Sequence, residues 1–218
     1  MSNPHLTTRN IVNLMFALAI TLLLILPSVN AAADTLNSAQ LAIKTSSDKI
    51  KTRLKTGDFK HDFYKVADYI DQVIQPHVDF PRISALVLGK HWRQASHQDR
   101  ERFIKEFRTL LVRTYARAFV QFDDWSLHFL PMQLNEQDSK ILVRTEVLQP
   151  GKPGIDVDYR MIRKKNTWKA YDIVIEGVSL VTNYRSTFAN QMLSIGSLSK
   201  LIDHLAEKNA AALTKTPS

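Results

Sequence analysis

One stretch near the C-terminus constrains the fold more than any other, because a strand pattern there passes directly into a helix pattern. Residues 168–176 are rich in aromatic and β-branched side chains with polar residues interleaved, which is typical of a strand. Gly177 interrupts this pattern. Beyond it, the side chains that recur at helical spacing are Val178, Val181, Tyr184, Arg185 and Phe188. A strand that turns at a glycine into an amphipathic helix can close a sheet against a helical layer, and the crevice between the layers is a candidate ligand site.

The chain before position 124 predicts helices, because its apolar side chains recur three or four positions apart. Gly57, Pro76 and Gly89 stand where such helices would end. Ser96 followed by Asp99 resembles the start of a capping box. The predicted helices cover residues 36–55, 62–75, 79–88 and 96–120.

From position 124 the apolar pattern changes to a period of two, which indicates strands. The predicted strands cover residues 124–134, 139–149, 155–164 and 167–176. Their links are short, so consecutive strands pair as an antiparallel meander. Two more helices are predicted at 178–194 and 197–208. This order predicts an α+β fold, in which a four-stranded antiparallel meander sheet packs against a layer of helices with a hydrophobic pocket between them.

The N-terminus has the pattern of a secretory signal peptide over residues 1–33. Arg9 precedes an almost wholly apolar run at 11–26, and small residues with A-x-A-like spacing follow. This run is shorter than the roughly 20 residues that a membrane-spanning helix needs. We therefore expect an exported chain with a single α+β domain at 34–208 and a disordered tail at 209–218. The chain has no cysteine, so its core must form without disulfides.

Charge and motifs narrow the class of function. The formal charge of +8 becomes +7 when the signal peptide removes one arginine and no acid, which favours anionic partners, and export argues against nucleic acid. The sequence shows no nucleophile motif, no phosphate-binding glycine loop and no zinc spacing among its histidines. These absences favour a protein that is not an enzyme and that holds no metal and no cofactor. Periodicity does not separate a filled core from a pocket, so an exported small-molecule enzyme and an adaptor with a filled core stay open as alternatives to a binding protein.

Four segments, taken in order, resemble those of one known family. The sequence DIVIEGVSLVTNYR at 172–185, followed by Phe188, is similar to the hallmark segment of the MlaC family. LGKHW at 88–92 resembles the family's LGxxW turn, and FIKEFRTLLVRTY at 103–115 resembles its long helix. Residues 196–205 resemble its terminal G-x-x-x-L-I-x-x-L helix. The chain departs from the family at 194–197, where SIGS stands in place of consecutive glycines.

The resemblance implies a phospholipid carrier of the Gram-negative periplasm, which holds its ligand between sheet and helices. It also implies two partners, the inner-membrane Mla ABC transporter complex and the outer-membrane Mla lipoprotein complex, and we expect a monomer. The residues expected by phase to face the lipid are Leu111, Tyr115, Val143, Val157, Tyr159, Ile173, Ile175, Val181, Tyr184 and Phe188.

Two residues near the glycine corner have more specific expected roles. Arg185 is predicted to pair with Glu176 and so hold the corner. A place at the pocket mouth, where Arg185 would meet the lipid phosphate, is the alternative. Gly177 is a candidate hinge for lipid loading.

Overall fold

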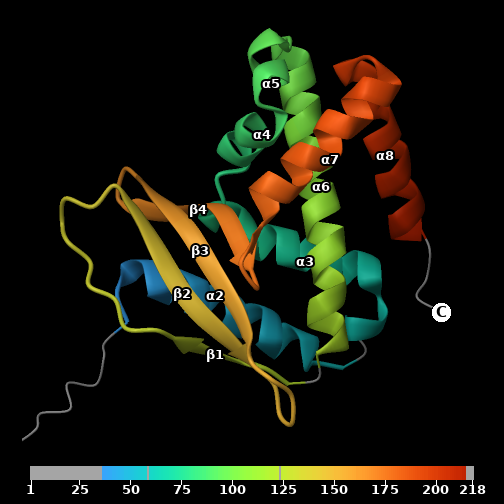
Figure 1. The fold of residues 1–218 in the computed structure, drawn as a ribbon. Coiled ribbons are helices and arrows are strands. Elements are labelled where there is room, and N and C mark those ends of the chain that lie inside the picture. The colour runs from blue at the N-terminus through green and yellow to red at the C-terminus, as the bar shows by residue number, and fades with distance from the viewer. Residues whose placement is uncertain (1–35, 58, 123, 215–218) are drawn as a thin grey trace, which may run out of the picture. The chain divides into compact units, whose positions relative to one another are not determined.

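The computed structural model describes residues 36–57, 59–122 and 124–214 (Figure 1). The predicted signal peptide at 1–33 lies outside these residues. Within these ranges, no helix is both long enough and apolar enough to cross a bilayer. The helices are α2 (Ser38–Leu54), η1 (Phe59–His61), α3 (Phe63–Ile74), η2 (Gln75–His77), α4 (Phe80–Leu88), α5 (Lys90–Gln94), α6 (His97–Gln121), α7 (Leu180–Ile195) and α8 (Leu198–Thr214).

The strands form one antiparallel meander in the order β1-β2-β3-β4-β5. They are β1 (Ser126–Phe129), β2 (Lys140–Leu148), β3 (Ile155–Lys164), β4 (Thr167–Ile175) and β5 (Val178–Ser179). The predicted α+β architecture is confirmed, with five strands in place of the predicted four. The first strand is shorter than predicted and ends before Pro131, a residue that cannot donate to a ladder.

The extra strand, β5, explains what the glycine corner does. Glu176 and Gly177 both have positive φ, at 49° and 76°, as in the two-residue turns that join antiparallel strands. The chain therefore folds back after β4, pairs through Val178 and Ser179, and enters α7 at Leu180. The sequence prediction began this helix at 178 because a two-residue strand gives no periodic signal.

The C-terminal helix is longer than predicted. We expected disorder from position 209, but α8 continues through Thr214, and residues 215–218 lie outside the described ranges. Asn209 is only 2% exposed and anchors this part of the helix. Its side chain accepts a hydrogen bond from Arg113 Nε at 2.8 Å and donates to the Glu106 carbonyl at 2.9 Å. These contacts to α6 hold the last turns in place.

The sheet faces a helical layer that is organised along α6. Helices α4, α5 and α7 gather round one end of α6, whereas α2 and α3 lie at its other end (Figure 1). The start of α6 is capped as predicted, since Ser96 accepts a hydrogen bond from the Asp99 N–H at 3.1 Å. The Val78–Ala170 bridge joins the helices directly to β4, and the Asp79 N–H donates to the Ala170 carbonyl at 2.8 Å.

The buried apolar residues form three separate clusters in place of one continuous core. The first joins α2, α3 and α6 around Val66 and Trp125. The second joins α4, α6, α7 and α8 around Phe103 and Leu201. The third packs the start of α2 on the sheet around Val143. Domains of this size usually bury one contiguous core, so the division indicates that something interrupts the packing at the centre.

Candidate functional site

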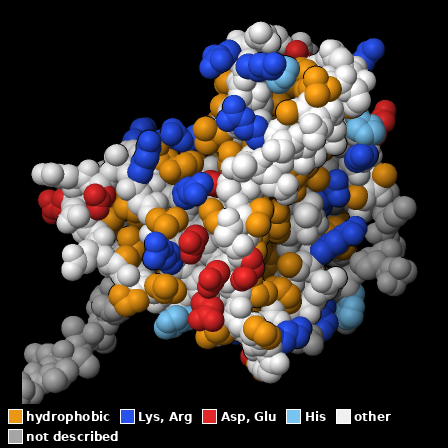
Figure 2. Space-filling view, viewed as in Figure 1, with side chains coloured by type: hydrophobic (Ala, Val, Ile, Leu, Met, Phe, Trp, Pro, Cys, Tyr) orange, Lys and Arg blue, Asp and Glu red, His pale blue; other side chains and the backbone are white. Residues whose placement is uncertain are grey.

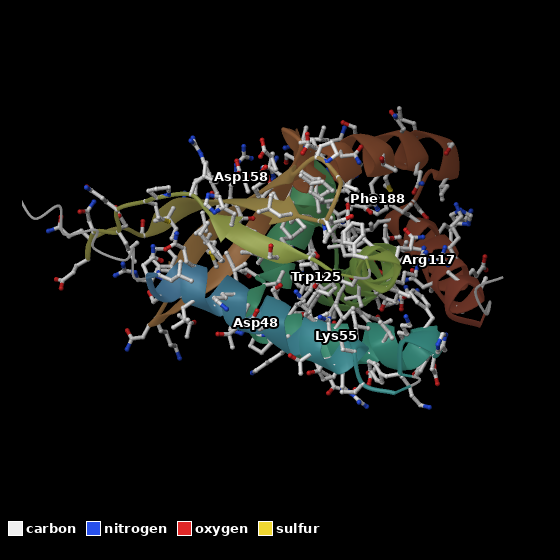
Figure 3. All side chains as sticks on the ribbon, turned by 90° about the horizontal axis from the view of Figure 1, so that it is seen from below. Asp48, Lys55, Arg117, Trp125, Asp158 and Phe188 are labelled. Carbon is white, nitrogen blue, oxygen red and sulfur yellow. The ribbon has the colours of Figure 1, made fainter. Side chains whose placement is uncertain are left out.

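A cavity of about 290 Å³ lies between the sheet and the helices. Its wall includes members of all three clusters, such as Ile50, Ile83 and Tyr159, so the cavity is the feature that divides the core. Strand alternation explains the sheet side, because Val157 and Tyr159 face inward while Asp158 between them lies on the outer face (Figure 3). Hydrophobic side chains also reach the surface along the boundary between the sheet and α6 (Figure 2).

Seven of the ten residues predicted to face a ligand are brought together around this cavity. They come from three places: the middle of α6, the inner faces of β3 and β4, and the first turn of α7. These seven are Leu111, Tyr115, Val157, Tyr159, Ile173, Ile175 and Val181.

The other three predicted residues do not line the cavity. Val143 is fully buried against Ala39 and Trp168, where the start of α2 covers the sheet. Phe188 packs edge-on against Phe107, with ring centroids 5.5 Å apart, in the cluster between α6 and α7. Tyr184 contacts the same Phe107 ring at 5.1 Å. Since Phe107 itself lines the cavity, the two aromatic residues stand behind its wall.

The prediction missed the α2 and α3 side of the cavity. Helix α2 presents small and apolar side chains there, with Ala42, Ser46 and Ile50 spaced four apart along one face. The small side chains of Ala42 and Ser46 leave room beside the helix. Their spacing is the sequence pattern that could have predicted this side of the cavity. The remaining wall residues from these two helices and η2 are Ile43, Ser47, Ile70, Ile74 and His77.

Three titratable groups at the wall, Tyr159, Tyr115 and His77, have pKa values shifted toward their neutral forms. Burial raises the pKa of Tyr159 to about 12. Burial also raises the pKa of Tyr115, whose hydroxyl shares a hydrogen bond with that of Tyr184. For His77, burial lowers the pKa, and the nearby charges of Lys49 and Lys169 act in the same direction. Each shift favours the uncharged form of the side chain, as an apolar ligand requires.

Asp172 is the one carboxylate among the described residues that line the cavity, and its contacts are internal. It is only 3% exposed. Its oxygens accept hydrogen bonds from Arg160 Nη1 at 2.8 Å, Ser179 Oγ at 2.7 Å and the Val181 N–H at 3.1 Å. A carboxylate at the first turn of α7 also interacts favourably with the helix dipole. Asp172 therefore anchors β5 and the start of α7 to the sheet.

The predicted clamp between Arg185 and Glu176 is wrong. The Glu176 carboxylate accepts a hydrogen bond from the Asp156 N–H at 2.6 Å. The Arg185 guanidinium lies instead against Gly89, where an added Cβ would be 3.2 Å from its Nη2 atom. The alternative, a place at the cavity mouth, does not hold either, because Arg185 is not among the residues that line the cavity.

Together, the wall of the cavity is suited to hold hydrocarbon. Its inner surface is almost wholly apolar, and its few polar groups are neutral or internally bonded. Among the described residues, no three His, Asp or Glu side chains converge as a metal site would require.

A meander sheet closed by helices over an apolar cavity defines the class of this protein as an α+β protein with an internal hydrophobic site. The chain belongs to the MlaC family, since the family model described as "MlaC protein" matches residues 44–207.

Individual relatives agree with this assignment. The intermembrane phospholipid transport system binding protein MlaC of Haemophilus influenzae is 24% identical over 156 residues, which cover 69% of this chain and 72% of that protein. The toluene tolerance protein ttg2D of Pseudomonas putida is 24% identical over 147 residues, which cover 66% of this chain and 68% of that protein. The phospholipid-binding protein of Ralstonia solanacearum, solved in complex with a phospholipid, superposes with a TM-score of 0.74 at 31% identity. That comparison covers 82% of this chain and the whole of the solved chain.

Proposed function

We propose that this protein binds a phospholipid in the cavity and carries it through the periplasm between the inner and outer membranes. The observation that carries the proposal is the apolar cavity between sheet and helices, which divides the core into three clusters. The related Ralstonia solanacearum protein, solved with a phospholipid, supports the choice of ligand. Its proposed partners are the Mla transporter complex of the inner membrane and the Mla lipoprotein complex of the outer membrane.

The energetics of lipid transfer explain why a carrier is needed. Two acyl chains of about sixteen carbons, at ~0.8 kcal/mol per buried CH₂, give on the order of 25 kcal/mol of transfer free energy. A lipid therefore does not cross an aqueous compartment unaided at a useful rate. The carrier must replace the apolar contacts of the membrane, and the wall of the cavity offers such contacts from both layers.

The size of the cavity bears on how a lipid enters. At about 290 Å³ it lies at the lower limit of ligand pockets, which run from roughly 300 to 1,000 Å³. A two-chain lipid therefore needs the walls to separate, and we expect the sheet and the helices to move apart on loading. Loading then takes place at a docked membrane complex, where the exposed apolar walls remain covered.

The structure offers no support for the two alternative functions, an adaptor and a small-molecule enzyme. The adaptor alternative assumed a filled core, whereas this protein has a cavity between the sheet and the helices. A small-molecule enzyme would need polar groups free to act on a substrate, whereas Asp172 already accepts three internal hydrogen bonds. No observation favours either alternative, and we propose neither.

Lipid content tests the proposal directly. The exported protein is purified without detergent and extracted with organic solvent, and phospholipid is quantified by mass spectrometry against protein. We expect stoichiometric phospholipid in the wild type and a loss of most of it in Val157→Trp and Ile175→Trp, because a bulky ring fills the cavity. The matched control is Leu142→Trp, at a position on β2 that is 37% exposed. Wild-type protein without lipid, or both cavity variants with full lipid, would contradict the proposal.

A further inference from the structure

A second hollow, of about 510 Å³, is lined by residues of α4, α5 and α7. Figure 1 shows these three helices gathered round one end of α6. We call this hollow the cationic cleft. Its basic side chains come from two sides, with Arg185 on α7 and with Lys90, His91 and Arg93 on α5. Its floor is apolar and includes the buried side chains Val87, Leu88 and Phe188. The cleft shares no described lining residue with the cavity, so the two sites are separate.

Within the part of the chain that the structure describes, no ion pair neutralises the lysine and arginine charges of the cleft. No Asp or Glu is found among its described lining residues. The ion pairs among the described residues involve other arginines and lysines, and none includes Lys90, Arg93 or Arg185. Gly89 lets the Arg185 guanidinium approach the backbone of the α4–α5 junction closely. Like charges gathered in one recess repel each other, and an anion placed there relieves that repulsion.

Helix α7 adds an apolar component on the same side. Arg185, Ala189 and Leu193 are spaced four apart and share one face, and Met192 beside them lines the cleft. Leu193 is 86% exposed, the largest fraction among the exposed large hydrophobic residues of the described ranges. Figure 2 shows Lys, Arg and His side chains beside hydrophobic ones at this end. A groove between helices that combines cations with apolar contacts matches the helix-in-groove mode of recognition.

From these features we infer that the cationic cleft is a docking groove for an acidic, amphipathic segment of a partner protein. Charge complementarity specifies the acidic face of that segment, and Met192 with Leu193 specifies its apolar face. The basic side chains line a recess, which a helical segment of a protein can enter. A membrane surface would instead contact side chains that project from the protein, so we favour a protein partner. The inference goes beyond lipid binding, and it stands or falls independently of what occupies the cavity.

A synthetic peptide tests the inference on the full-length exported protein. The probe is a fluorescent amphipathic helix with Glu on one face and Leu on the other, and fluorescence anisotropy gives its Kd. We expect the triple variant Lys90→Gln, Arg93→Gln, Arg185→Gln to raise this Kd about tenfold, since each exposed ion pair contributes roughly 0.2–1 kcal/mol. Leu193→Glu should weaken binding as well, at a position too exposed to disturb folding.

A matched control separates a site from general attraction. The triple variant Lys105→Gln, Arg144→Gln, Lys200→Gln removes the same charge from exposed positions outside the cleft and should leave the Kd unchanged. If both triple variants raised the Kd equally, the docking groove would be overturned, because net charge alone would then explain peptide binding. Binding to phosphatidylglycerol vesicles that depends on the cleft residues, with none to the peptide, would also overturn it, in favour of a membrane-facing surface. Lipid content should match the wild type in every variant, which keeps this test apart from that of the proposed carrier function.

Discussion

The cavity and the cationic cleft differ in what they can attract, although α7 contributes to both. The cavity takes Val181 from the first turn of α7 and is apolar, with its polar groups neutral or internally bonded. The cationic cleft takes Arg185 and Met192 from later turns and carries charge that no internal group neutralises in the described structure. Burial of apolar area is non-directional, whereas charge recognition acts at a distance and depends on salt. One helix thus links a site suited to hold a cargo with a site suited to recognise a partner.

The largest expected effect comes from the anchor that both hollows share. Asp172→Ala should lower the free energy of unfolding by about 2–3 kcal/mol, because it leaves the Ser179 hydroxyl and the Val181 N–H without their acceptor. Urea unfolding measures this change, and both lipid content and peptide binding should fall with it. Asp156→Ala is the control, an exposed carboxylate on β3 that should change stability by less than about 0.5 kcal/mol. If α7 kept both functions without Asp172, the two hollows would not depend on a common anchor.

A smaller loss is expected at the turn before α7. Gly177→Val should cost about 1–2 kcal/mol, because φ is +76° and a β-branched residue is strained there, although no atom crowds an added Cβ. Asn tolerates this conformation, so Gly177→Asn should stay near the wild-type stability. If the turn also serves as a hinge, the valine variant exchanges fluorescent phospholipid between vesicles more slowly. A folded valine variant with normal exchange would limit Gly177 to its role in the β4–β5 hairpin.

Salt should separate the two hollows cleanly. Raising the ionic strength from about 0.05 to 0.5 M shortens the Debye length severalfold and should therefore raise the Kd of the acidic peptide for the cationic cleft. The phospholipid retained after gel filtration at either salt concentration should not change, because apolar burial carries the binding. Salt-induced release of lipid would show that charge contributes to the cavity as well.

The smallest effect is expected from pH. Burial lowers the pKa of His77 from its ordinary value of 6.5, so protonation is harder in the folded chain than in the unfolded one. The contribution of neutral His77 to stability is therefore complete above about pH 6.5 and is lost as the pH falls below that value. Urea midpoints at about pH 7.5 and 5.5 should differ less in His77→Gln than in the wild type. An equal difference in the two proteins would remove His77 as the cause.

Sequence patterns predicted the long elements of this fold well. Periodicity over ten residues located β3 at the residues where the structure has it, and cap residues located the start of α6. The patterns failed where an element was too short to show a period, or where its length depended on contacts with distant parts of the chain. A two-residue strand such as β5 has no period, and the end of α8 depends on contacts that Asn209 makes with a distant helix.

The candidate site shows a different limit. Periodicity places Tyr184 and Phe188 on the apolar face of α7 but does not reveal that this face contacts Phe107 in place of the cavity. For the same reason Val143 was assigned correctly to the inner face of the sheet, yet α2 covers that end of it. Which part of an apolar face borders an empty volume depends on how the layers pack, and no single strand or helix carries that information.

The division of the core into three clusters has a consequence for the thermodynamics of the whole domain. A ligand in the cavity would contact members of all three clusters, so it would fill the space between them and join them into one packed core. By mass action, a ligand present at 100 times its Kd stabilises the folded state by about 2.7 kcal/mol. We therefore expect the melting temperature to report occupancy, with the empty form melting first. Proteolysis would then remove empty chains preferentially, and the amount of this protein would follow the supply of its ligand.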